Sequence, residues 1–342
     1  MLTTGSNNMI DSFGTLSDIE DKLNDPIIKK LYDNLCEVNY HIGPMVQLNN
    51  KSSFSMSKFI SNKLYQKVLK RHNTKTIKWR VDGQQSHVDC ILHLYLKDNE
   101  KEPNIELLIK AISFMASFSN RNRKMTIKFA PLPDKKIISK KQQYFGPHSV
   151  NSASISYTET EMTINIYREE EAIKVLFHEI IHGLLFSSLD NYKEKVTERL
   201  CHKYNLNSKL ILINESYTEI WAKIMNCFFI STLASSNNYQ HFCTMLSIES
   251  DFSYSQGRKI HHYAQNMSDI DCDTNVSAYY LVVPEIFKRL PEFIKMCSFH
   301  PRVQDNDKCI DFIYHLDKIE HKKNTGEFQD TMRMSVMELK KL

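Results

Sequence analysis

The chain lacks several features that would assign it to a protein class at once. Its 342 residues contain no unbroken apolar run near the length of about 18 residues that a membrane-spanning helix needs. The N-terminus has no basic start followed by an apolar stretch, so no secretory signal is predicted. The 44 basic and 40 acidic residues leave a net charge of +4, which is too mild to indicate a nucleic-acid partner.

Paired cysteines are missing as well. The eight cysteines are spread along the chain and none forms a C-x-x-C pair, so no thiolate zinc site is predicted. Their wide spacing in a long chain also differs from that of a compact disulfide scaffold. Reduced thiols in a cytoplasmic setting are the simpler interpretation.

Against this background one motif stands out, the H-E-x-x-H sequence of residues 178–182 inside an otherwise apolar run. Histidines four residues apart project from one face of a helix with a rise of about 6 Å, so His178 and His182 can reach one metal ion. Glu179 can then stand beside the metal and take a proton from metal-bound water. Gly183 would leave room next to the metal. The alternative, a buried helix with two satisfied core histidines, would be costly without a metal.

A catalytic zinc site usually has three protein ligands, so a third is expected. Glu215 is the best candidate, because it lies in a segment with helical spacing and shares a helix face with Glu219. One of the two acids can bind the metal while the other accepts the outer N–H of a ligand histidine. The alternative is a pair of solvated acids on a surface helix.

The H-E-x-x-H motif followed by N-E-x-x-x-E at 214–219 resembles the gluzincin zinc metallopeptidases, to which thermolysin belongs. The resemblance covers roughly residues 151–222. It implies that His178, His182 and Glu215 bind Zn²⁺, that Glu179 is the general base and acid, and that Glu219 holds a ligand histidine. The stretch from His182 to Glu215 is longer than in thermolysin-like proteins, which leaves four competitors for the third ligand: Asp190, Glu194, Glu198 and His202.

A narrower likeness is to metallopeptidases encoded by large cytoplasmic DNA viruses. Besides the two motifs, it is carried by these segments: 151–152, 164–170, 274–276, 279–280 and 333–335. The likeness implies a location in the host cytoplasm or the virion and says little about the substrate.

Peptide hydrolysis places negative charge on an oxygen beside the metal, and gluzincin-like sites add a tyrosine or histidine that stabilises it. The candidates are Tyr279, Tyr280, His261 and His262. The two histidines follow basic residues and are expected at the surface, whereas the tyrosines lie on an apolar helix and could equally be core residues. Tyr280 is the preferred candidate. Arg333 either binds a substrate carboxylate or is a solvated side chain.

The succession of patterns predicts an α+β fold. Strands are expected at 77–81, 90–96, 125–130 and 162–167. The main N-terminal helices are expected at 16–38, broken or kinked at Pro26, and at 52–71 and 103–117. Beyond residue 222 the chain is predicted to be mostly helical, including segments 239–249 and 257–266. The resemblance implies a zincin-like core with a small mixed sheet, an active-site helix and a helical C-terminal subdomain. Strand 162–167 would border the cleft, with an edge that can pair with an extended peptide.

These observations predict a flexible leader over residues 1–16, an N-terminal α+β region over 17–150 and a catalytic region over 151–342. The predicted function is zinc-dependent hydrolysis of peptide bonds in a peptide or protein substrate. The alternatives are a non-catalytic zinc-bearing structural or partner-binding protein and a hydrolase of a non-peptide amide. No nucleic-acid or membrane partner is expected, and the oligomeric state is left open.

Overall fold

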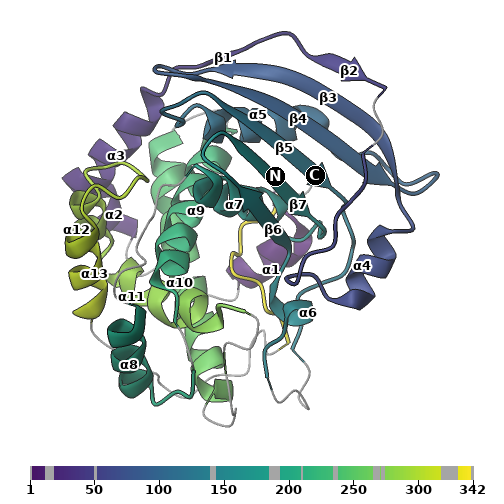
Figure 1. Ribbon diagram of the computed structural model, residues 1–342. Coiled ribbons are helices and arrows are strands. Elements are labelled where there is room, and N and C mark those ends of the chain that lie inside the picture. Colours follow the sequence, from purple (N-terminus) through teal and green to yellow (C-terminus); the bar gives the residue numbers. More distant parts are fainter. Residues whose placement is uncertain are drawn as a thin grey trace.

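The computed structural model describes residues 2–11, 19–49, 52–138, 144–184, 193–208, 211–233, 238–264, 270, 274–316 and 330–339. They form the mixed α+β fold that the sequence predicts, with a twisted sheet lying over a group of helices (Figure 1). In this described part, no helix combines the length and the apolar character needed to cross a bilayer.

The sheet has the strand order β1-β3-β4-β5-β7-β6, and β2 pairs with β3. Strands β4, β5 and β7 are parallel to one another, and the remaining pairs are antiparallel. The strands are β1 (His41–Ile42), β2 (Val46–Leu48), β3 (His72–Asp82), β4 (His87–Leu96), β5 (Arg123–Phe129), β6 (Ala153–Tyr157) and β7 (Glu161–Ile166). The four predicted strands are thus confirmed as the cores of β3, β4, β5 and β7.

Strand β6 corrects the expectation about the sheet edge. Strand β7 has β5 on one side and β6 on the other, so it is not an edge strand as predicted. The edge is β6, whose five residues include two serines and an alanine. Such a short strand of small residues gives a weak alternation signal, which is why the sequence did not reveal it.

The N-terminal helices are α1 (Thr4–Asp11), α2 (Ile19–Asn24), α3 (Pro26–Cys36), α4 (Asn62–Val68), α5 (Ile105–Ala116) and α6 (Pro147–Val150). Pro26 begins α3, where its missing N–H costs nothing, and Asp25 caps the helix by accepting from the N–H of Ile27 and Ile28. The predicted helix over 52–71 is wrong in its first half. It begins only after Ser61, whose hydroxyl accepts from the N–H of Leu64.

Helices dominate after residue 171: α7 (Ala172–Gly183), α8 (Lys193–Tyr204), α9 (Ile213–Thr232), α10 (Asn238–Ala264), the π-helix η2 (Ala278–Val282), α11 (Val283–Lys288), α12 (Leu290–Met296) and α13 (Asn306–Tyr314). Segments 239–249 and 257–266 were predicted as two helices, but α10 runs through both up to Ala264. Gly257 lies in the C-terminal third of α10, where a Cβ would approach the carbonyl oxygen of Tyr280 to 2.6 Å. The missing side chain therefore lets η2 lie directly against α10.

The two ends of the described chain lie side by side beneath the sheet (Figure 1). Leu2 forms an antiparallel bridge with Leu339, and the N–H of Thr3 donates to the carbonyl of Glu338 over 2.8 Å. Residues 4–11, which fall in the segment predicted as a flexible leader, form helix α1. The contact with the C-terminal segment orders these polar residues, and the sequence of the N-terminus alone could not predict such a contact.

Candidate metal centre

The H-E-x-x-H motif lies on α7, as predicted, and α7 packs against β6, β7, α5 and α9. Its apolar residues explain this position. Phe177 meets Phe114 of α5 and Phe229 of α9 edge-on, with ring centroids 6.2 and 5.7 Å apart. The aromatic contacts hold α7 between the sheet and α9 and leave its histidines facing the start of α9.

Gly183 closes α7 and allows a close approach to the sheet. A Cβ at this position would lie 2.5 Å from the sulfur of Met162 and 2.8 Å from Cδ1 of Ile155. The missing side chain therefore makes room for β6 and β7, not for the metal as the sequence suggested. The carbonyl of Gly183 also accepts a hydrogen bond of 2.9 Å from the buried guanidinium of Arg123.

Three side chains converge at one point. The Nε2 atoms of His178 and His182 lie 3.1 Å apart, and each lies 3.3 Å from Oε2 of Glu215. Within the described residues, these three form the group whose ligand atoms could hold a metal ion. Two imidazole nitrogens and a carboxylate oxygen are a donor set that zinc accepts, with a further position left for water or substrate.

The surroundings of His178 favour positive charge at this point. Burial alone would lower the pKa of His178, but its hydrogen bonds with Glu215 and Glu219 raise that pKa to about 9. Burial by itself would raise the pKa of Glu215, yet His182 and His178 hold it well below its ordinary value. The two carboxylates therefore stabilise a cation where the ligand atoms meet, which fits the requirement of a bound metal.

The ring nitrogen of His178 that points away from the ligand cluster, Nδ1, contacts Glu219 on α9. This nitrogen lies 2.9 Å from Oε2 of Glu219, and both oxygens of Glu219 accept from Nζ of Lys174, over 2.8 and 3.1 Å. Glu215 and Glu219 thus share the helix face that points to α7, as their spacing predicted. Because Glu219 accepts from Nδ1–H, the neutral imidazole that a metal would select keeps its lone pair on Nε2, at the point of convergence.

Glu179 lies outside the cluster of ligand atoms but lines the same cavity. Burial raises the pKa of its carboxyl above the ordinary value, although the two histidines oppose this effect. A raised pKa brings a glutamate closer to the neutral range in which a proton acceptor and donor works. A general-base role for Glu179 remains the prediction from the motif.

The structure does not bring Tyr280, the preferred tyrosine, to the candidate ligands. Its hydroxyl donates to the carbonyl of Met332, away from the cavity. The neighbouring Tyr279 reaches the site instead: its hydroxyl donates to Oε2 of Glu215 over 2.6 Å, and its ring stands edge-on to His178. Both tyrosines lie in the π-helix η2, a local widening that is frequent at functional sites.

The remaining candidates lie elsewhere. Nε2 of His261 lies 3.2 Å from the carbonyl of Tyr204, while the ring of His262 meets that of Tyr263, and neither histidine lines the cavity. Arg333 is buried, contrary to the expectation of a solvated side chain, and it does not line the cavity. It is 3% exposed and donates to the carbonyls of Ser335 and Val336.

The competitors for the third ligand do not join the cluster. Glu194, Glu198 and His202 lie on α8, away from α7 in Figure 1, and are not part of the metal-ligand group. Asp190 lies outside the described residues. Glu215 is therefore the acid that the structure brings to the two histidines.

The cavity extends from the histidines along β6. Its walls include Ile155 and Tyr157 of β6, His182 of α7, Asn214 of α9 and Tyr279 of η2, with Asn275 from the turn before η2. Sequence reasoning missed β6, Lys174 and the choice of Tyr279 over Tyr280. Lys174 carried a usable signal, because it lies four residues before His178 and so on the same helix face.

Comparisons with models of protein families, with curated proteins and with solved structures give no match to this chain.

Proposed function

We propose that this chain is a zinc-dependent hydrolase of peptide bonds. The observation that carries the proposal is the convergence of His178, His182 and Glu215 within 4.8 Å of one another, beside Glu179 in one cavity. A purely structural zinc site needs no acid–base residue next to its ligands. The placement of Glu179 therefore favours catalysis over a structural role.

Zinc would be held by His178, His182 and Glu215. When bound, it would lower the pKa of a water molecule and polarise the carbonyl of the substrate. Glu219 orients His178 for this purpose, and Lys174 balances the charge of Glu219 in the interior. The donor set and the open cavity suit zinc, although other divalent metals share a preference for such ligands.

Glu179 would act as base and then as acid. It would take the proton from the attacking water and return it to the amine that leaves when the C–N bond breaks. Burial raises its pKa, which makes its carboxylate a stronger base than an exposed glutamate. Tyr279 replaces Tyr280 as the candidate that stabilises the developing oxyanion, because its hydroxyl lies among the ligand atoms.

The edge of β6 supports an extended peptide as the substrate. The carbonyl of Ser152 accepts from Tyr167 and the N–H of Thr158 donates to Glu161, so these two residues pair with the β7 side. Hydrogen bonding alternates along an antiparallel pair, which turns the N–H and C=O groups of Ile155 and Tyr157 to the free edge. A peptide strand could pair with them and pass the histidines.

These features together support the zincin-like core and the gluzincin resemblance suggested by the motifs. The motif helix α7 packs against a mixed sheet with an antiparallel edge strand. Helix α9, which carries Glu215 and Glu219, comes later in the chain. The cytoplasmic setting remains a prediction from the cysteine pattern, and a host cytoplasm or virion remains a prediction from the likeness to viral metallopeptidases.

The test is cleavage of a library of unstructured peptides by the zinc-reconstituted protein, with the products identified by mass spectrometry. We expect cleavage that stops when zinc is chelated and returns when zinc is restored. Hydrolysis of small amides without peptide cleavage would point to a non-peptide amidase. Bound zinc with hydrolysis of neither kind would leave a non-catalytic zinc-bearing protein.

A further inference from the structure

Lys174 is a buried cation of the candidate site, and the proposed hydrolysis gives it no role beyond balancing the charge of Glu219. It lies on α7 one turn before His178 and its side chain is 1% exposed. An ammonium group at such depth is retained only with compensating partners. Its Nζ finds them in both oxygens of Glu219 and in the sulfur of Met334, which lies 3.6 Å away.

The geometry at Glu219 links Lys174 to the ligand histidine. Oε1 of Glu219 accepts from Lys174 over 2.8 Å, whereas Oε2 is shared between Lys174 and Nδ1 of His178. With both oxygens engaged, the carboxylate of Glu219 has one orientation that satisfies all its partners. Without the ammonium group, Glu219 would be a buried carboxylate held by the histidine alone, free to rotate or to take up a proton.

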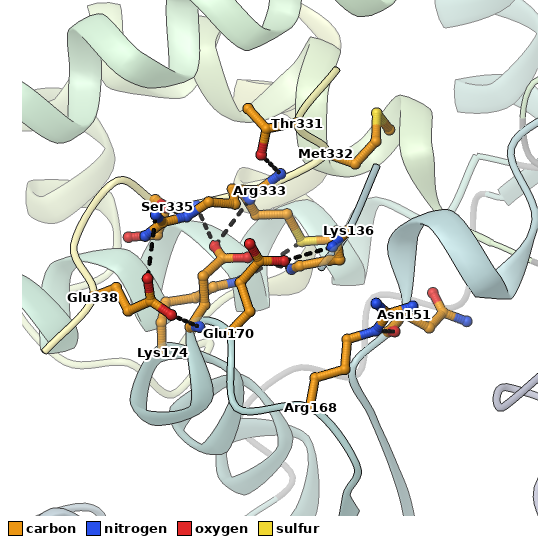
Figure 2. Close-up of polar contacts among 12 residues, drawn as sticks. Lys136, Asn151, Arg168, Glu170, Lys174, Thr331, Met332, Arg333, Ser335 and Glu338 are labelled. Atoms are coloured by element: carbon orange, nitrogen blue, oxygen red, sulfur yellow. Dashed lines mark hydrogen bonds and ion pairs between the residues drawn. The ribbon is translucent and has the colours of Figure 1, made fainter. Parts of the chain in front are cut away.

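The C-terminal segment 330–339 packs against this ion pair through Met334, and Met334, Lys174 and Glu219 line the same cavity. The carboxylate of Glu171, one turn before Lys174, accepts from the backbone N–H of Met334 and Ser335 and is paired with Lys136. Figure 2 shows Arg333 and Ser335 of the segment gathered with Lys136 around the start of α7. Met334 is thereby held against the ammonium group of Lys174.

From these contacts we propose that Lys174 is a positioning residue of the metal centre, which fixes Glu219 and, through it, the imidazole of His178. The inference rests on the proposed metal site but not on catalysis. A partner that orients a metal-ligating histidine typically changes metal affinity about 10- to 100-fold when it is removed. Lys174 orients Glu219, so its removal should lower zinc affinity by loosening the imidazole of His178.

The test is the zinc dissociation constant, measured by competition with a chelator, for wild type, Lys174→Met, Glu219→Gln and the double variant. Each single variant should weaken zinc binding about 10- to 100-fold. The double variant should be no weaker than the weaker single one, because both substitutions break the same chain of contacts. Lys174→Arg, which keeps the charge and the donors, should recover most of the affinity.

Lys203→Met is the matched control, since it removes a cation paired over 2.5 Å with buried Glu285 far from the cavity. It should leave zinc affinity unchanged. Circular dichroism shows whether each variant folds. If Lys174→Met does not fold, the inference is supported by weak zinc binding of Glu219→Gln together with near-normal zinc binding of Lys174→Arg. Additive effects, or unchanged affinity in Lys174→Met, would overturn it. A wild type that binds zinc without cleaving peptides would refute the proposed function alone, and one that binds no zinc would refute both.

Discussion

The hydroxyl of Tyr279 donates a 2.6 Å hydrogen bond to Oε2 of Glu215, the oxygen that lies 3.3 Å from Nε2 of both His178 and His182. Tyr279 is therefore joined to the point at which the three candidate ligands meet. Asn275, one turn earlier, donates in turn to the hydroxyl of Tyr279 over 3.4 Å. A phenol held at this point could turn its single O–H from Glu215 to charge that develops at the metal centre.

Tyr279→Phe should keep zinc bound and lower kcat by about 10²-fold, the order of magnitude seen when a transition-state donor is removed. The measurement is steady-state kinetics with a peptide found in the library screen. Tyr280→Phe is the control, because it loses only the hydrogen bond to the carbonyl of Met332 and should cost about 1 kcal/mol of stability with kcat unchanged. Full activity of Tyr279→Phe would contradict the role given to its hydroxyl.

Glu179→Gln should bind zinc as wild type does and lose at least about 10²-fold in kcat, since the amide cannot accept the proton of the attacking water. Zinc content and peptide hydrolysis are measured on the same preparation. Glu169→Gln, which changes an exposed glutamate before α7, is the matched control and should remain active. Hydrolysis by Glu179→Gln at the wild-type rate would remove Glu179 from the mechanism.

The sequence could not show which of Tyr279 and Tyr280 faces the candidate ligands. Adjacent residues of a helix face different directions, and a π-turn shifts those directions further, so an apolar pattern could not decide between them. The motif residues on α7 were predictable because helical spacing alone places both histidines on one face. The convergence of α7 with α9 adds Glu215, which depends on tertiary packing as well as on spacing.

Buried charges are the second class of features that the sequence did not reveal. Charged residues are normally exposed, so Lys174 and Arg333 were not expected in the interior. Their burial depends on partners far away in the chain, such as Glu219 for Lys174 and Ser6 for Arg333. Such pairs become visible only when the fold brings the C-terminal segment to the start of α7.

Glu171→Ala should destabilise the fold by about 3–5 kcal/mol, because it leaves Lys136 without its buried counter-charge and frees the N–H groups of Met334 and Ser335. Urea unfolding measures the effect. Glu169→Ala, the exposed neighbour, should stay within about 0.5 kcal/mol of wild type. Equal stability of the two variants would show that the C-terminal segment is held by other contacts.

Lys259 should make stability depend on pH. Burial lowers its pKa to about 7, although Asp330 opposes the shift. The unfolded lysine keeps its proton up to a pH of about 10.4, so between these values the unfolded state binds more protons and stability rises with pH. The unfolding free energy of wild type should therefore increase relative to that of Lys259→Met above pH 7, by up to about 1.4 kcal/mol per pH unit. Parallel pH profiles of the two proteins would refute the low pKa.

The most direct measurement is the zinc content of the protein purified without chelator, for wild type, His182→Ala and Glu215→Ala. We expect about one zinc per chain in wild type and loss of that zinc in both variants, since each removes one of three protein ligands. Zinc retained in Glu215→Ala but lost in His182→Ala would show that Glu215 is not the third ligand. A wild-type protein that takes up no zinc would contradict the metal centre itself.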